Sequence, residues 1–120
     1  MAQRIGLLML LEGATFVVAA LIHGGVLLAG YEHQQASIAE SVIGSVLLVG
    51  AALAWARPTW TREVGLAAQG FALLGTLVGV FTIIIGVGPR TTPDIAYHLG
   101  IVVVLAWGLV MAARAQPSTE

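Results

Sequence analysis

The chain has 120 residues, which is enough for one domain; 58% of them are hydrophobic and only 9% are charged. A soluble domain carries about 25% charged residues, so this composition excludes a water-covered globule and predicts an integral membrane protein. The net charge of -1 argues against nucleic-acid binding, and the absence of cysteine excludes disulfides, thiolate metal sites and c-type haem attachment.

Four apolar segments are each long enough to cross a hydrocarbon core of about 30 Å, which takes about 20 helical residues. The predicted helices cover about residues 5–28, 36–56, 63–87 and 93–113. We expect the first to be a retained helix rather than a signal peptide, because three similar segments follow it. No period-two alternation runs through these segments, so strands are not expected. We therefore predict an all-α, antiparallel four-helix transmembrane bundle within residues 1–114, with a disordered tail over 115–120.

Polar turns separate the four helices. The first covers residues 30–35 and opens with glycine, the second covers 57–62 and contains proline, and the third covers 86–92. Thr92 then begins the last helix as an N-cap, followed by proline and an acidic residue. Because all the turns are short, neighbouring helices are expected to run antiparallel.

The basic residues are distributed unevenly between the two sides of this bundle. Arg4, Arg57, Arg62 and Arg114 fall on the side of the termini, and Arg90 alone falls on the other. Since positive charge accumulates on the cytoplasmic side of membrane proteins, we expect a multi-pass protein of the bacterial inner membrane with both termini in the cytoplasm.

Three ionisable residues on different helices are predicted to lie at one depth below the periplasmic surface. At a rise of about 1.5 Å per residue, His23 lies about 10 Å below it, Glu40 about 6 Å and His98 about 8 Å. Ionisable side chains within a bilayer are costly and usually functional. We therefore predict a ligand site formed by His23, Glu40 and His98, supported by Asp94 one turn above His98.

Tyr97 and Arg90 are expected beside this site, and His33 is expected to be a solvated loop residue. Two imidazoles and a carboxylate suit a divalent transition metal, two imidazoles suit axial haem ligation, and an imidazole–carboxylate pair suits a quinone-like ligand. The spacing does not choose among these cofactors. The alternative is that each group is satisfied separately, with Asp94 serving only as a helix-start acid and Glu40 reaching water.

A second polar pair is predicted nearer the cytoplasmic side. Glu12 lies three helical turns below His23 on the same face, and Gln69 of the third helix falls at a similar depth. A protonated Glu12 bound to Gln69 would hold two helices together. Alternatively, Glu12 would carry protons or bind a cation.

The segment Leu-Leu-Glu-Gly-Ala-Thr around Glu12 resembles the first helix of the small multidrug resistance exporters, which are also short four-helix chains. That resemblance implies proton exchange for a cationic substrate at Glu12. The chain departs from the family in having few aromatic residues to line a cavity, since its second and third helices hold only Trp55, Phe71 and Phe81. Its arginine bias also implies one fixed orientation, and we do not favour this family.

Residues 88–98, Gly-Pro-Arg-Thr-Thr-Pro-Asp-Ile-Ala-Tyr-His, resemble a segment of small four-helix bacterial membrane proteins of no settled function. Those proteins also have a histidine late in the first helix and a glutamate early in the second, as His23 and Glu40 are here. The resemblance implies the architecture and the periplasmic cluster, and it implies no activity.

Three functions therefore stay open: a ligand-binding membrane protein using His23, Glu40 and His98, a proton-coupled transporter using Glu12, and a structural subunit without a ligand. An enzyme is the least supported class, because no cysteine, serine–histidine–acid set or phosphate loop occurs. Lipid is the expected partner, with a second copy of the chain or a larger membrane complex as further alternatives.

Overall fold

The computed structural model describes residues 1–116 and contains four long helices. They are α1 (Ala2–His23), α2 (Gln34–Ala56), α3 (Thr61–Ile84) and α4 (Thr92–Arg114), with a short 3-10 helix η1 (Pro58–Trp60) before α3. No strand occurs in this part of the chain, as predicted. Each long helix has the length and apolar composition needed to cross a membrane.

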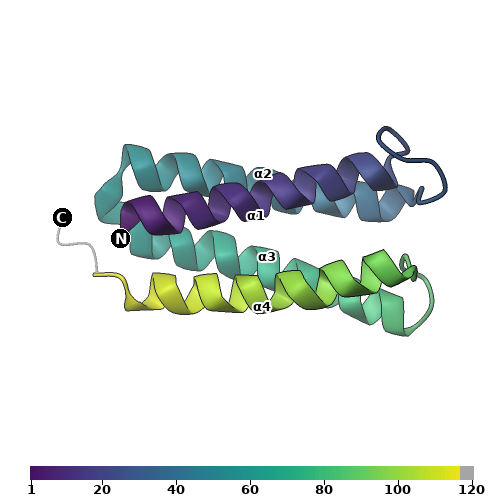
Figure 1. The fold of residues 1–120 in the computed structure, drawn as a ribbon. Coiled ribbons are helices and arrows are strands. Elements are labelled where there is room, and N and C mark those ends of the chain that lie inside the picture. Colours follow the sequence, from purple (N-terminus) through teal and green to yellow (C-terminus); the bar gives the residue numbers. More distant parts are fainter. Residues whose placement is uncertain (117–120) are drawn as a thin grey trace.

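The helices run antiparallel in two pairs, α1 with α2 and α3 with α4, and the start of α1 and the end of α4 lie at one end (Figure 1). We call this the terminal end; the opposite end, which holds residues 24–33 and 85–91, is the loop end. Contact is most extensive within each pair, and α1 has little contact with α4. The molecule measures 48 × 25 × 17 Å.

Two helices end earlier than the sequence predicts, and a left-handed glycine is the reason in both. α1 ends at His23 rather than near residue 28, because Gly25 adopts a φ of 78° and Val26 N–H donates to the Leu21 carbonyl. α3 ends at Ile84 rather than near 87, where Gly86 has a φ of 86°. Glycine is favoured in this conformation and commonly ends a helix. Because the residues that follow are still apolar, hydropathy alone placed both ends too late.

The other helix ends differ from the prediction by three residues or fewer. α4 begins one residue earlier, with Thr91 rather than Thr92 as its N-cap. Within the predicted tail, Ala115 is buried against the core. Gln116 is exposed, and residues 117–120 of that tail lie outside the described residues.

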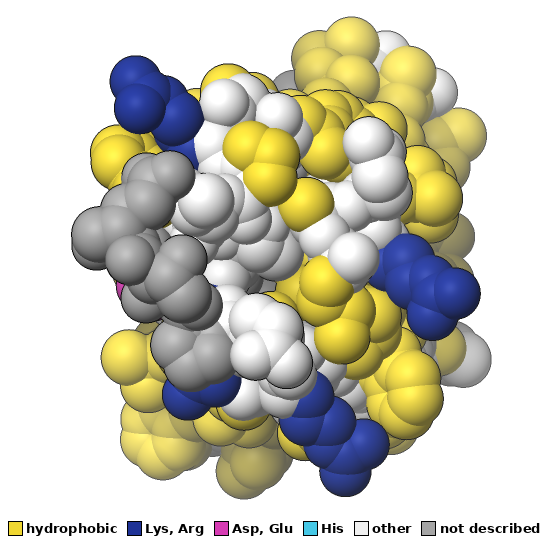
Figure 2. Space-filling model, turned by 90° about the vertical axis from the view of Figure 1, so that its left-hand side faces the viewer, with side chains coloured by type: hydrophobic (Ala, Val, Ile, Leu, Met, Phe, Trp, Pro, Cys, Tyr) yellow, Lys and Arg dark blue, Asp and Glu magenta, His cyan; other side chains and the backbone are white. Residues whose placement is uncertain are grey.

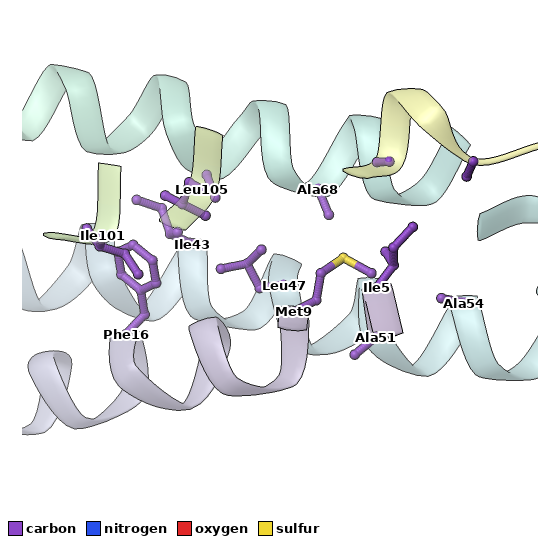
Figure 3. Close-up of a cluster of buried hydrophobic side chains, with 13 residues drawn as sticks. Ile5, Met9, Phe16, Ile43, Leu47, Ala51, Ala54, Ala68, Ile101 and Leu105 are labelled. Carbon is purple, nitrogen blue, oxygen red and sulfur yellow. The ribbon is translucent and has the colours of Figure 1, made fainter. Parts of the chain in front are cut away.

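The core is a continuous apolar cluster along the bundle axis (Figure 3). Its large side chains come from α1, α2 and α4, whereas α3 contributes mainly alanines. The labelled members include Met9, Phe16, Ile43, Leu47 and Leu105.

Glycines allow the closest backbone contacts of the bundle. A Cβ atom on Gly13 would lie 3.2 Å from the Gly44 carbonyl oxygen, and one on Gly44 would lie 3.3 Å from the Gly13 carbonyl oxygen. Small residues bring helices together in this way in lipid, where dispersion contacts rather than the hydrophobic effect hold helices to each other. The extensive α1–α2 contact follows from this glycine pair.

Arginine side chains surround the terminal end (Figure 2). Arg4 and Arg62 lie near the starts of α1 and α3, and Arg57 and Arg114 lie at the ends of α2 and α4. The guanidinium of Arg57 lies 5.3 Å from the ring centroid of Trp60. Arg62 donates to the carbonyl of Ala113 next to the α4 terminus. Cationic and aromatic side chains therefore share this end, which is typical of a membrane interface.

Candidate functional site

A buried hydrogen-bond network of three ionisable residues lies at the loop end. His23 Nδ1 is 2.6 Å from Glu40 Oε1, and His23 Nε2 is 2.8 Å from Asp94 Oδ1. The exposed fractions are only 4% for His23, 5% for Glu40 and 7% for Asp94. The network therefore joins α1, α2 and α4 through one imidazole ring that has a carboxylate at each nitrogen.

The start of α4 fixes Asp94 in this network. The Thr91 backbone N–H donates to Asp94 Oδ2 at 3.1 Å, and the Thr91 hydroxyl donates to the same oxygen at 2.5 Å. This reciprocal capping box satisfies the free donors at the helix terminus. Its consequence for the site is that Oδ2 is held by Thr91 while Oδ1 points to His23.

The structure brings His23 and Glu40 together, as the sequence suggested, but places Asp94 rather than His98 on the other nitrogen. The early end of α1 explains the difference, because His23 is the last residue of its helix and so lies level with the third residue of α4. His98 lies one turn deeper, where its Nδ1 donates to the Asp94 carbonyl at 2.7 Å.

The hydrogen-bond partners define which nitrogens are free. A backbone carbonyl only accepts, so Nδ1 of His98 carries a hydrogen, and a neutral ring keeps Nε2 as an acceptor. Both ring nitrogens of His23 are hydrogen-bonded to carboxylates, so metal or haem ligation through either nitrogen would displace a carboxylate. Within residues 1–116, no group of three or more His, Asp or Glu side chains is arranged to hold a metal ion.

A cavity of about 380 Å³ lies between α2 and α3 on the Glu40 side of the network. Its walls are mainly apolar, with Phe16, Ile43 and the glycines 75 and 79 among them. His98 and Glu40 both line it. His98 Nε2 packs against Gly79, where a Cβ atom would lie 3.2 Å away.

The polar atoms of this α2/α3 cavity are nearly all acceptors. Glu40 Oε2 is buried and has no hydrogen-bond partner. The hydroxyls of Thr76 and Thr82 already donate to carbonyls of their own helix, at 2.7 and 2.6 Å. The His33 Nε2 hydrogen is directed at the Val87 carbonyl. Apart from the exposed amide of Gln35, the cavity wall therefore needs donors from whatever occupies it.

A second hollow, of about 570 Å³, lies between α1 and α4, where those helices have little contact. The surface of its wall is mostly apolar, although Thr15, His23, Tyr31, Asp94 and Tyr97 form part of that wall. Tyr97 and Thr15 share a 2.9 Å hydrogen bond across it. We call it the α1/α4 groove.

The other residues predicted near the site, Tyr97, Arg90 and His33, lie in different surroundings. The ring of Tyr97 packs edge-on against Phe16 and His98, with centroids 5.8 and 6.0 Å apart. Arg90 is exposed on the loop before α4. His33 was predicted as a solvated residue, but its Nδ1 accepts from Ala36 N–H and caps α2, while its Nε2 donates to the 85–91 loop.

The deeper polar pair forms a direct contact between α1 and α3. Gln69 Nε2 donates to Glu12 Oε1 at 2.5 Å, and both side chains are fully buried. Glu12 Oε2 and Gln69 Oε1 have no partner. Neither the α2/α3 cavity nor the α1/α4 groove is lined by Glu12.

The capping roles of Thr91 and His33 were not expected from the sequence, although the sequence carries a signal for that of Thr91. Thr91 and Asp94 are three residues apart before an apolar run, which is the spacing of a capping box. A histidine N-cap has no comparable signature. Comparison with family models, curated proteins and solved structures finds no match, so both resemblances noted from the sequence stay predictions and the site is interpreted from its geometry.

Proposed function

We propose that this chain is a multi-pass protein of the bacterial inner membrane that binds a quinone-like ligand, in its reduced hydroquinone form, in the α2/α3 cavity. The observation that carries the proposal is the unpartnered, buried Glu40 Oε2 in a mainly apolar cavity that also exposes His98. A buried acceptor without a partner costs about 1–3 kcal/mol, and a ligand hydroxyl would recover that free energy.

The acceptor character of the wall supports the reduced form of such a ligand. A hydroquinone brings two hydroxyl donors on a flat apolar ring, whereas the oxidised quinone offers only carbonyl acceptors. Glu40 Oε2 and His98 Nε2 are the two acceptors suited to those hydroxyls. The cavity volume of about 380 Å³ is within the range of about 300–1,000 Å³ usual for small-molecule sites.

The other candidate functions have less support from the geometry. Metal or axial haem ligation by His23 would require it to lose a carboxylate partner. A transporter that uses Glu12 would need a cavity at that residue, and there Gln69 already occupies one carboxylate oxygen.

The membrane location is supported by two independent features. All four long helices have spanning length and composition. The terminal end carries four of the five arginines, which under the positive-inside rule supports a cytoplasmic terminal end and a periplasmic loop end. The proposed site would then open near the periplasmic surface.

Calorimetric titration of the protein in lipid nanodiscs tests the proposal, with decylubiquinol and decylubiquinone as probes under anaerobic conditions. We expect the quinol to bind at least about tenfold more tightly than the quinone, a difference of about 1.4 kcal/mol. Glu40→Leu removes the buried acceptor from the cavity wall, so the preference for the quinol should fall about tenfold or more. Ser45→Ala is the control, because this exposed hydroxyl only donates to its own helix. Equal affinity for both probes, or no binding of either, would contradict the proposed function.

A further inference from the structure

We propose that Glu40, His23 and Asp94 form a proton relay, so that binding of a hydroquinone in the α2/α3 cavity releases a proton at the α1/α4 groove. This inference rests on the proposed function and adds a second activity to it. Its basis is a juxtaposition: the three residues form an unbroken hydrogen-bonded row, with distances of 2.6 and 2.8 Å, whose two ends line different hollows.

The two hollows lie on opposite sides of the network. The α2/α3 cavity is lined by Glu40 and not by His23 or Asp94, while the α1/α4 groove is lined by His23 and Asp94 and not by Glu40. The imidazole ring is therefore the bridge between them. Its only hydrogen-bonded partners are the two carboxylates, and it is almost completely buried.

An imidazole suits this position because it can accept a proton at one nitrogen while releasing another from the second. The relay starts from a state with one proton on Glu40 Oε1, facing His23 Nδ1, and a second on His23 Nε2, facing Asp94 Oδ1. A ligand hydroxyl that donates to Glu40 Oε2 competes with the bound proton for the carboxylate. The Oε1 proton then moves to Nδ1, and the Nε2 proton moves to Asp94 Oδ1.

The protons balance in this sequence. Glu40 loses one proton, His23 gains one and loses one, and Asp94 gains one and releases it to water at the loop end. The hydroxyl of the ligand keeps its own proton, so no oxidant is required. Dissociation of the ligand returns a proton to Glu40 by the reverse path, which resets the imidazole.

Other titratable residues lie beside the relay, and two of them, Tyr31 and Tyr97, line the α1/α4 groove with His23 and Asp94. The His33 ring lies 6.5 Å from that of His23, but its two nitrogens are engaged with Ala36 and Val87. His98 lies on α4 below Asp94, bound to its carbonyl. The charged residues of α3, Arg62 and Glu63, lie at the terminal end. A released proton is thus assigned to the Glu40–His23–Asp94 row.

The proton count on binding tests the relay. Titration of decylubiquinol into the nanodisc protein is repeated at one pH in phosphate and in Tris, whose ionisation enthalpies differ. We expect release of about one proton per bound quinol by the wild-type protein. His23→Gln keeps hydrogen-bonding atoms near both carboxylates but cannot pass a proton, and its count should fall to about zero. The readout is the number of protons, which a merely structural role of His23 would leave unchanged.

The wild-type measurement alone can overturn the proposal, so the result does not depend on folding of the variant. Quinol binding without proton release contradicts the relay and leaves the proposed function intact. Absence of quinol binding contradicts the proposed function itself. A second variant, Asp94→Asn, removes the terminal proton acceptor and retains an oxygen acceptor for His23. Quinol binding by either variant with undiminished proton release would also overturn the relay.

Discussion

At the residue scale, three buried side-chain oxygens within residues 1–116 have no hydrogen-bond partner, and two of them belong to the same contact. Glu12 Oε2 and Gln69 Oε1 are both buried and unpartnered, although the other ends of these groups share a 2.5 Å hydrogen bond. A protonated carboxyl group would satisfy both, because its hydroxyl can donate to Gln69 Oε1 in a cyclic acid–amide pair. The contact would then serve as neutral helix–helix adhesion between α1 and α3.

This arrangement predicts an ordered set of stabilities. Gln69→Leu leaves Glu12 buried without any partner and should cost about 1–3 kcal/mol of stability. Glu12→Gln forms an amide–amide pair and should change stability by less than about 1 kcal/mol. The double variant Glu12→Leu/Gln69→Leu removes both polar groups and should recover most of the loss. Thermal unfolding in detergent, followed by circular dichroism, measures all three; a double variant less stable than Gln69→Leu would contradict the pairing.

The depth of a residue, counted along its helix, predicts its contacts only where the helix ends are predicted correctly. Glu12 and Gln69 were placed at one level correctly because both lie well inside their helices, where a uniform rise per residue holds. His23 was paired with the wrong residue of α4 because its depth was counted back from a helix end that the glycines at 24 and 25 bring forward. An error of one turn at a terminus exchanges Asp94 for His98.

At the scale of the helices, glycines decide how closely elements pack. A Cβ atom on Gly108 of α4 would lie 2.6 Å from Gln69 Cδ, whereas one on Gly100 of the same helix would meet nothing within 4 Å. Gly108→Ala should therefore destabilise the protein by about 1–3 kcal/mol through overpacking against the buried amide.

Gly100→Ala is the matched control for that variant. It adds the same methyl group to the same helix and should be neutral or slightly stabilising, because alanine favours helix more than glycine does. The comparison is made by thermal unfolding of both variants under one condition. Equal melting temperatures for the two alanine variants would show that α4 does not pack on Gln69 as described.

A helix, or one of its ends, could be predicted from the sequence where a single physical signal, such as hydropathy or a capping residue, marks it. Hydropathy located all four helices, since a run of apolar residues identifies a span wherever its ends lie. The start of α4 was found within one residue from its capping residues. The two hollows could not be foreseen, because they depend on which helix pairs pack closely, and that follows from glycine contacts such as Gly13 with Gly44.

At the scale of the whole molecule, the uneven distribution of charge predicts how the bundle sits in a membrane. Arg4, Arg57, Arg62 and Arg114 lie at the terminal end, and Arg90 lies alone at the loop end. Retention of arginine on the cytoplasmic side should give one orientation in all copies. The relay and the cavity at the loop end would then communicate with the periplasm.

Single cysteines test this orientation cleanly, because the natural chain contains none. Gln34→Cys places a thiol at the exposed start of α2, at the loop end, and Gln116→Cys places one in the exposed segment after α4, at the terminal end. In intact bacterial cells, a membrane-impermeant maleimide should label position 34, and it should label position 116 only after the membrane is permeabilised. Labelling of both positions in intact cells would indicate dual orientation, as in proteins without a charge bias. Labelling of position 116 alone would place the Glu40–His23–Asp94 network on the cytoplasmic side, so a proton released at Asp94 would enter the cytoplasm.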